Sequence, residues 1–205
     1  MESRASFLES IRLEDGQFPF LAYHQNRFDR TRQQFCKKDK PIFLAETLKV
    51  PQEYSKGVYK VRVEYHCDII ELSYLPYQIR AVHSLKLVDG NHIDYPYKYA
   101  DRLAIDTLFA ERGNCDDILM VKNGLITDTS YANVILHDGQ YWYTPANPIM
   151  SGTCRARLME EGKVLPADIY VEHLKDFKEI RLINAMMNID QGPRVPIANV
   201  SMENF

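Results

Sequence analysis

Long hydrophobic runs are missing from this sequence, and so is a strong excess of one charge. No apolar stretch in the 205 residues approaches the length that a membrane-spanning helix requires, and the opening MESRASFLESIRLEDG has no signal-peptide core. The formal net charge is −3, which provides no attraction to nucleic acid or to an anionic membrane. We therefore expect a cytoplasmic protein that binds small molecules rather than nucleic acid or membranes.

Clustered metal ligands are also absent from the sequence. The cysteines Cys36, Cys67, Cys115 and Cys154 are widely spaced and form no C-x-x-C pair, and the six histidines show no metal-ligand spacing. The sequence thus suggests neither a disulfide framework nor a metal site. Repeats and low-complexity tracts are missing too, and the 45% hydrophobic content is enough for a substantial core in one or two domains.

The first part of the chain has the pattern of a small α+β domain, predicted to span residues 1–90. Residues 58–65 alternate between apolar and polar side chains, which predicts a strand with Val61, Val63 and Tyr65 on one face. Asp89-Gly90-Asn91 is a turn signal at the domain boundary. The other predicted elements are a strand over 18–23, a helix over 24–36, and strands over 69–74 and 79–87.

The second part, residues 91–205, is predicted to form a larger domain. A helix is expected over 99–112, ending at Gly113. Its apolar stripe is made by Leu103, Ala104, Thr107 and Leu108. Lys122-Asn123-Gly124 carries the Asn-Gly signature of a hairpin turn. The other predicted elements are strands over 117–121, 134–136, 141–144, 180–184 and 195–200, and helices over 153–161 and 173–177.

Three chemical groups occur in an order that suits pyridoxal 5'-phosphate (PLP). Lys98 precedes a predicted helix and offers an amine for a Schiff base with the cofactor aldehyde. Asp128 offers the carboxylate that keeps the pyridine nitrogen protonated in a water-poor site. Gly152, Thr153 and Cys154 open a helix whose backbone N–H groups suit a phosphate. The sequence therefore predicts PLP as the cofactor, with Lys98 as the catalytic residue.

The motifs around these residues resemble those of class IV aminotransferases, the fold-type IV PLP enzymes. The matching segments are residues 9–12, 24–27, 126–134, 143–145 and 152–155. The resemblance implies a two-domain α+β fold like that of D-amino-acid aminotransferase, and a homodimer. It also implies that Arg27, in the H-x-x-R motif, binds the cofactor phosphate, and that Asn133 belongs to the cofactor site. On this basis Arg27→Ala is expected to weaken PLP binding with little loss of stability.

Within the family, two segments favour one branch. The spacing of Lys98 and Arg102 and the run Asn184-Ala185-Met186 resemble 4-amino-4-deoxychorismate lyase, which expels pyruvate and leaves 4-aminobenzoate for folate biosynthesis. An amino-acid aminotransferase is the alternative, because both reactions begin with the same chemistry. A PLP-fold binding protein with weakened catalysis is the third possibility.

The sequence departs from the family in several places. Asp128 stands where most members have glutamate, and Cys154 stands where several have threonine. The strand pair that precedes the E-T-x-R motif in relatives is missing, so we expect an N-terminally truncated fold and a different substrate pocket. Lys60 and Arg62 are candidates for binding a substrate carboxylate, although they equally fit the solvent face of a strand. Tyr131 is a further substrate candidate.

Overall fold

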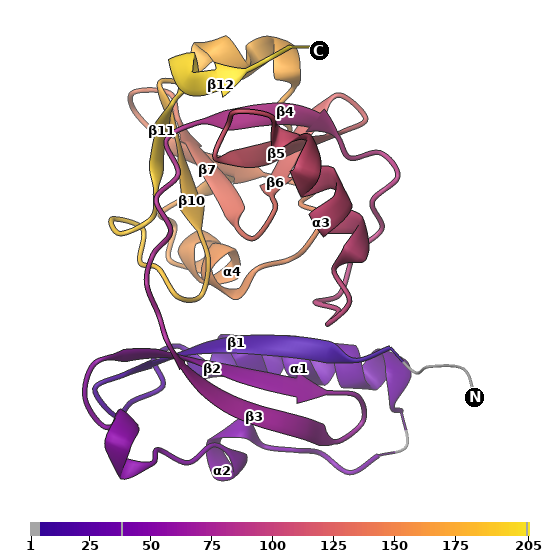
Figure 1. Cartoon of the computed structure of the whole chain (residues 1–205), viewed down its shortest axis with the longest axis vertical. Coiled ribbons are helices and arrows are strands. Elements are labelled where there is room, and N and C mark those ends of the chain that lie inside the picture. Colours follow the sequence, from indigo (N-terminus) through magenta and orange to yellow (C-terminus); the bar gives the residue numbers. More distant parts are fainter. Residues whose placement is uncertain (1–4, 38, 204) are drawn as a thin grey trace. The chain divides into compact units, whose positions relative to one another are not determined.

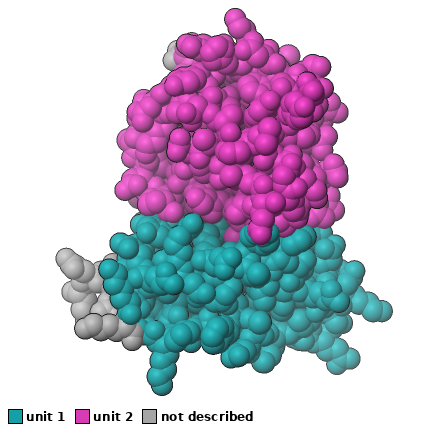
Figure 2. Space-filling view, turned by 180° about the vertical axis from the view of Figure 1, so that it is seen from behind, with its two compact units in different colours: residues 1–78, 97–101 teal, residues 79–96, 102–205 magenta. Residues whose placement is uncertain are grey.

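A computed structural model describes residues 5–37, 39–203 and 205 (Figure 1). The chain forms two compact units, which Figure 2 colours separately. The first contains the residues up to Gln78 together with Tyr97–Asp101, and the second contains Ile79–Pro96 and Arg102–Phe205. Among the residues described, no helix combines the length and the hydrophobicity needed to cross a membrane.

The first unit is built on an antiparallel sheet of strand order β1-β2-β3. Its elements are β1 (Phe7–Glu14), α1 (Leu21–Phe35), the single turns α2 (Leu44–Thr47) and η1 (Gln52–Tyr54), β2 (Val58–Tyr65) and β3 (Ile69–Pro76). The predicted alternation in β2 is confirmed, because Val61, Val63 and Tyr65 are at most 1% exposed. These side chains form a core with Phe28 of α1 and Ile11 of β1.

The predicted strand over residues 18–23 is wrong. Phe20 has a φ of 62°, in the left-handed region, and is the residue at which α1 begins. Residues 21–23 therefore form the first turn of the helix, and the aromatic run that suggested a strand lies across a turn and a helix start. The strand that does precede α1 is β1, which carries residues 9–12 of the E-T-x-R motif.

The second unit contains a larger mixed sheet of order β11-β10-β7-β6-β5-β4-β12, with β8 paired to β7 and β9 paired to β8. Its strands are β4 (Leu85–Asp89), β5 (Asp117–Lys122), β6 (Leu125–Thr129), β7 (Asn133–His137), β8 (Trp142–Pro145), β9 (Leu165–Ala167), β10 (Glu179–Ile183), β11 (Arg194–Pro196) and β12 (Val200–Ser201). The predicted hairpin is present between β5 and β6, where Asn123 and Gly124 both have positive φ. This hairpin places Asp128 in the interior of the unit.

Helices of the second unit are short. They are α3 (Leu103–Phe109), η2 (Ala110–Arg112), α4 (Thr153–Glu160), η3 (Val171–Asp176) and η4 (Ile197–Asn199). The predicted apolar stripe of α3 is confirmed at Leu108, which is buried, but it is wrong at the other three positions, because Leu103 is 73% exposed and Ala104 and Thr107 are exposed, whereas Ile105 is buried. The helix also begins later than predicted, because Tyr99 pairs with Phe7 of β1 instead.

The two units also divide at a different place from the predicted boundary near Gly90. Residues 79–84 form no strand, and β4 begins only at Leu85. β4 pairs in parallel with β5, so it belongs to the second unit although it precedes the boundary that the turn signal marks. The Lys98 segment belongs to the first unit although it follows that boundary.

Cys36 and Cys67 form a disulfide, which the sequence did not suggest. Cys36 caps the C-terminal end of α1, and Cys67 lies in the turn that joins β2 to β3. They are 31 residues apart, and the fold brings their Cα atoms to 5.4 Å. A scattered pair of this kind carries no local spacing signal, which explains why the disulfide could not be predicted from the sequence.

Candidate cofactor site

In the second unit, Asp128 is the centre of a fixed polar group. Its side chain is on β6 and the residue is 5% exposed. The amide of Asn133 donates to one carboxylate oxygen at 2.6 Å, and the backbone N–H of Met150 donates to the other at 3.0 Å. Asn133 also donates to the Met150 carbonyl at 2.9 Å. Strands β6 and β7 and the segment before α4 therefore hold the carboxylate in one orientation.

The electrostatic state of Asp128 is unusual for a carboxylate. Burial raises its pKa from 3.8 to about 6, although the hydrogen bonds from Met150 and Asn133 and the charge of Arg155 act in the opposite direction. Desolvation thus outweighs the donors that surround the group. A carboxylate in this position gains from any additional positive charge brought next to it.

The start of α4 lies beside the Asp128 group. Gly152 is the residue before the helix, and a Cβ added to it would overlap the side-chain oxygen of Asn133. Only glycine therefore allows this close approach. Thr153 and Cys154 follow as the first residues of the helix, where backbone N–H groups have no partner within the helix itself. The amino-terminal end of α4 has the donor geometry that suits an anion.

The side chains of Cys154 and Arg155 are directed into the second unit. The Cys154 thiol packs with Ile135 and Leu158 and points to the Met187 carbonyl, with sulfur and oxygen 3.8 Å apart. Burial raises the pKa of this thiol. Of Cys154, only the backbone N–H remains as a group that suits a phosphate.

Arg155 fastens α4 to the neighbouring strand β8. Its Nε–H donates to the Thr144 hydroxyl at 3.2 Å, and an Nη2–H donates to the Pro145 carbonyl at 2.7 Å. The family-like segments 143–145 and 152–155 are therefore joined to each other by hydrogen bonds.

Arg102 and Asp117 support the turn that follows Asp128. Arg102 donates to the Ser130 carbonyl at 2.7 Å. The Ser130 hydroxyl donates to Asp117 at 3.1 Å, and Asp117 is fully buried and paired with Arg80. Arg102 of the lysine motif thus acts on the turn between β6 and β7.

In the first unit, the Lys98 segment is held along the edge of β1. The N–H of Leu8 donates to the Lys98 carbonyl, and the N–H of Ala100 donates to the Ser6 carbonyl, both at 2.8 Å. The flanking aromatic residues also belong to this unit, with the ring centroids of Tyr99 and Phe7 5.2 Å apart. Lys98 itself is half-buried on a backbone that is fixed on both sides.

Arg27 belongs to a buried ionic group around Glu9. Two N–H groups of its guanidinium donate to the two Glu9 oxygens, at 2.8 and 2.6 Å, and Nδ1 of His24 lies 2.6 Å from one of them. Glu9 is 0% exposed. Burial raises its pKa, but Arg27 and His24 lower it further, and the pKa falls from 4.5 to about 2. The motifs E-T-x-R and H-x-x-R are thus joined within one unit.

The three substrate candidates are distributed over both units. Arg62 on β2 donates to Glu64 at 2.7 Å, and Lys60 lies two residues before it on the same face of the strand. Both side chains lie on the face opposite to the core residues Val61 and Val63. Tyr131, in the second unit, has the guanidinium of Arg80 4.6 Å from its ring centroid.

Sequence reasoning missed Glu9 as a site residue, although a signal was present. Phe7, Glu9, Ile11 and Leu13 alternate along β1 on one face, and the three apolar members are buried. A carboxylate on an apolar face of a strand requires a cationic partner. Met150 and Asp117 carried no comparable signal, because their roles depend on backbone contacts and on partners distant in sequence.

Comparison with known proteins agrees with these motifs. The model of the family described as amino-transferase class IV matches residues 6–191. An uncharacterized protein of Haemophilus influenzae is 36% identical over 180 residues, covering 87% of this chain and 96% of that protein. A Haemophilus somnus protein, provisionally named a 4-amino-4-deoxychorismate lyase, has a crystal structure that matches with a TM-score of 0.83 and 33% identity, covering 91% of this chain and 98% of its own.

A hypothetical aminotransferase from Mycobacterium tuberculosis, in its PLP-bound form, matches with a TM-score of 0.70. It is 16% identical, and the match covers 93% of this chain and 80% of that one. This likeness concerns the fold alone. Together with the family match over residues 6–191, the comparisons show that this chain belongs to the class IV aminotransferase family and has the α+β fold of fold-type IV enzymes.

Proposed function

We propose that this chain is a PLP-dependent enzyme that eliminates pyruvate from 4-amino-4-deoxychorismate. The observation that carries the cofactor assignment is the Asp128 group. A buried carboxylate held by Asn133 and Met150, with its pKa raised to about 6, suits a protonated pyridine nitrogen, because the cation replaces the stabilisation that water would give. When bound, PLP supplies an aldehyde for the substrate amine and a ring that accepts electrons.

The remaining residues take the roles that their chemistry allows. Lys98 provides the amine that holds the cofactor and later moves a proton. The backbone N–H groups of Gly152, Thr153 and Cys154 receive the phosphate at the start of α4. Arg27 adds positive charge for the phosphate, as the family resemblance implies, while Glu9 holds its guanidinium. Asn133 orients Asp128.

The choice of a lyase is supported by the lysine motif and by the Haemophilus somnus relative, whose provisional name is a 4-amino-4-deoxychorismate lyase. An amino-acid aminotransferase is the second candidate, because the matching family is that of class IV aminotransferases and both reactions begin with the same chemistry. A PLP-fold protein with weakened catalysis is the third. Lys60, Arg62 and Tyr131 are proposed to contact the substrate. We also propose that the chain forms a homodimer and acts in the cytoplasm.

The first experiment tests the cofactor. The purified chain given PLP should develop a visible absorption band, and borohydride should fix the cofactor covalently to the peptide that contains Lys98. Lys98→Ala should lose the label, whereas Lys56→Ala, at an exposed position in the same unit, should retain it. Labelling of a different lysine, or of none, would contradict the assignment.

The second experiment separates the two reactions. A lyase needs no second substrate, so pyruvate should be released continuously from 4-amino-4-deoxychorismate with no keto acid present. An aminotransferase must alternate between two substrates and gives at most one turnover per site with the first alone. Lys60→Ala and Arg62→Ala should mainly raise KM if these cations bind a substrate carboxylate equally in the ground and transition states. If pyruvate release stays at background while amino groups pass steadily from an amino acid to 2-oxoglutarate, the lyase assignment is wrong and the chain is an aminotransferase.

A further inference from the structure

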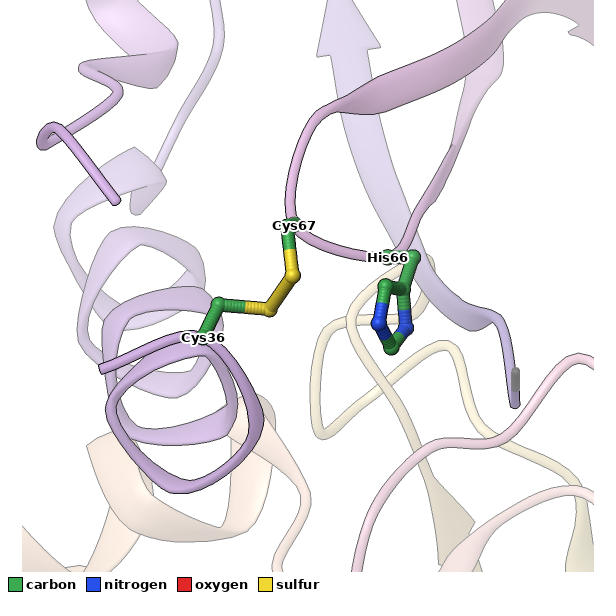
Figure 3. A group of neighbouring side chains, drawn as sticks. All are labelled: Cys36, His66 and Cys67. Atoms are coloured by element: carbon green, nitrogen blue, oxygen red, sulfur yellow. A yellow bond between two sulfur atoms is a disulfide. The ribbon is translucent and has the colours of Figure 1, made fainter. Parts of the chain in front are cut away.

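Cys36, His66 and Cys67 form a cluster of metal-ligating side chains in the first unit (Figure 3). One ligand atom from each residue can be chosen such that all three lie within 4.8 Å of one another. Cys36 is buried, and the other two are half-buried. A cavity of about 430 Å³ is lined in part by Arg32, Cys36 and Asp39, so it reaches one member of this cluster, Cys36.

The two cysteines are held in place by more than their sulfur–sulfur bond. The N–H of Cys36 donates to the Arg32 carbonyl at 2.6 Å, and Nε–H of the same arginine donates to the Cys67 carbonyl at 2.8 Å. The N–H of His66 donates to the Asp68 carbonyl at 3.1 Å. Arg32 therefore ties the end of α1 to the β2–β3 turn. These contacts involve no sulfur atom, so none of them requires the S–S bond.

One hydrogen bond determines the tautomer of His66. Its Nδ1 lies 2.7 Å from the Ala5 carbonyl oxygen, which can only accept a hydrogen bond. Nδ1 must then carry the proton, and in the neutral ring Nε2 carries the lone pair. The ring is also stacked on Phe7, with an interplanar angle of 13°. Metal-ligating histidines commonly donate their other N–H to a backbone carbonyl in this way.

From this arrangement we propose that the thiol form of the chain binds Zn²⁺ through Cys36, Cys67 and His66. Two thiolates and one imidazole match the ligands that Zn²⁺ prefers, and water completes a tetrahedral site. The hydrogen bond to the Ala5 carbonyl leaves Nε2 of His66 with the lone pair that a metal ion can accept.

The metal form and the disulfide form exclude each other, because both use the same sulfur atoms. A thiol reductant supplies two electrons and two protons to the disulfide and is itself oxidised to a disulfide. Zn²⁺ then displaces the protons of the Cys36 and Cys67 thiols as it binds. An oxidant that removes two electrons restores the S–S bond and releases the ion. The site therefore links metal binding to the thiol state of the first unit.

The test uses the untagged full chain without added PLP. It is reduced, freed of reductant under anaerobic conditions, and titrated with Zn²⁺ against a chromophoric chelator, and with Co²⁺ as a spectroscopic probe. The proposal expects one ion per chain, release of protons on binding, and the intense visible and thiolate-to-metal absorption bands of tetrahedral cobalt. The disulfide form of the same chain should bind neither ion at this site.

Variants identify the ligands. Cys36→Ser/Cys67→Ser should abolish the cobalt bands, and His66→Gln should weaken Zn²⁺ binding at least tenfold, a loss that even outer-shell partners of a metal cause. Cys115→Ser, at a free cysteine in the second unit, should change neither. His66→Gln can first be folded in its disulfide form, so its result stands even where the double cysteine variant fails to fold. Unchanged affinity in His66→Gln, or a cobalt spectrum without thiolate bands, overturns the proposal.

Discussion

Replacing Arg27 by alanine should destabilise the first unit strongly. The substitution removes two hydrogen bonds and the full positive charge next to Glu9, which is 0% exposed. Breaking a buried ion pair by removing one partner costs about 3–5 kcal/mol, because the other charge is left without compensation. The lowering of the Glu9 pKa from 4.5 to about 2 corresponds to about 3 kcal/mol, which agrees with this range. The sequence alone led us to expect little loss of stability in Arg27→Ala. The buried pair with Glu9 leads us to expect a large loss instead.

The same group predicts a dependence on pH. Between pH 4.5 and about 2 the unfolded chain binds a proton at Glu9 that the folded chain does not. The contribution of Glu9 is therefore fully present above pH 4.5 and is lost as the pH falls toward 2. In Arg27→Ala most of this contribution should be missing at neutral pH.

The assay must follow the first unit specifically. The single tryptophan, Trp142, lies in the second unit, so its fluorescence does not report on β1 and β2. Native-state hydrogen exchange of the β1–β2 amides in increasing urea measures the opening free energy directly. Arg62→Ala is the matched control, because the Arg62–Glu64 pair is partly exposed and should contribute at most about 1 kcal/mol.

A second variant separates charge from packing. Arg27→Met combined with Glu9→Leu removes both charges, and it should recover most of the stability that Arg27→Ala loses. A loss below about 1 kcal/mol in Arg27→Ala, or a β1–β2 opening free energy that does not change between pH 5 and 2, would refute the assignment of Glu9 as a carboxylate that depends on Arg27.

Further predictions concern the second unit. In the cofactor-free chain the pKa of Asp128 is raised, so between pH 3.8 and about 6 the folded state binds a proton that the unfolded state does not. The free energy of unfolding, followed by Trp142 fluorescence, should therefore fall by about 3 kcal/mol as the pH rises through that window. Asp128→Asn should not show this fall. The same variant should keep PLP bound but lower turnover, since a neutral amide does not stabilise a pyridinium; unchanged turnover would make Asp128 purely structural. Gly152→Ala should weaken PLP binding, measured by absorbance titration, because its Cβ displaces Asn133. Added to Asn133→Ala, Gly152→Ala should have little further effect, and an additive loss would show that the contact is not the cause.

Local patterns allowed much of the fold to be predicted. Strict alternation identified β2, and the Asn-Gly turn identified the β5–β6 hairpin that places Asp128 in the interior. Both signals depend on side chains that are neighbours in sequence, which is why they survive in the folded chain. The family resemblance likewise identified two segments, residues 126–134 and 152–155, as parts of one site. The structure brings them into contact through Asn133 and Gly152.

The failures arise where a distant partner decides the local structure. Residues 99–101 have a helical pattern, but pairing of Tyr99 with Phe7 holds them along β1, so α3 starts later and turns a different face inward. The Cys36–Cys67 bond and the Glu9 ion pairs depend on how α1 packs against β1 and β2. The spacing of residues along the chain does not identify the partner in any of these contacts.

The buried carboxylates of Glu9 and Asp128 differ in how well their charge is compensated. This difference helps to interpret the aspartate that this chain has where most family members have glutamate. Glu9 has its charge compensated by groups of this chain, and its pKa is lowered to about 2. Asp128 is also buried, but the hydrogen bonds of Asn133 and Met150 and the charge of Arg155 offset less than burial costs, and its pKa is raised to about 6. An ionised carboxylate has about four positions for accepting hydrogen bonds, so the Asn133 amide and the backbone N–H groups of Met150 and Ile149 fix its plane without filling it.

Incomplete compensation in a rigid site is the property expected of a binding group, whereas complete compensation is that of a structural one. The shorter side chain of aspartate loses about 1.5 Å of reach compared with glutamate. At the same time it lets the Met150 backbone and the Asn133 amide hold the carboxylate directly from β6, β7 and the start of α4. A fixed carboxylate is better prepared for a cation than a longer and freer one, because no side-chain freedom is lost on binding. On these grounds we propose that the replacement of glutamate by Asp128 is an adaptation of the site, in which better orientation offsets the shorter reach.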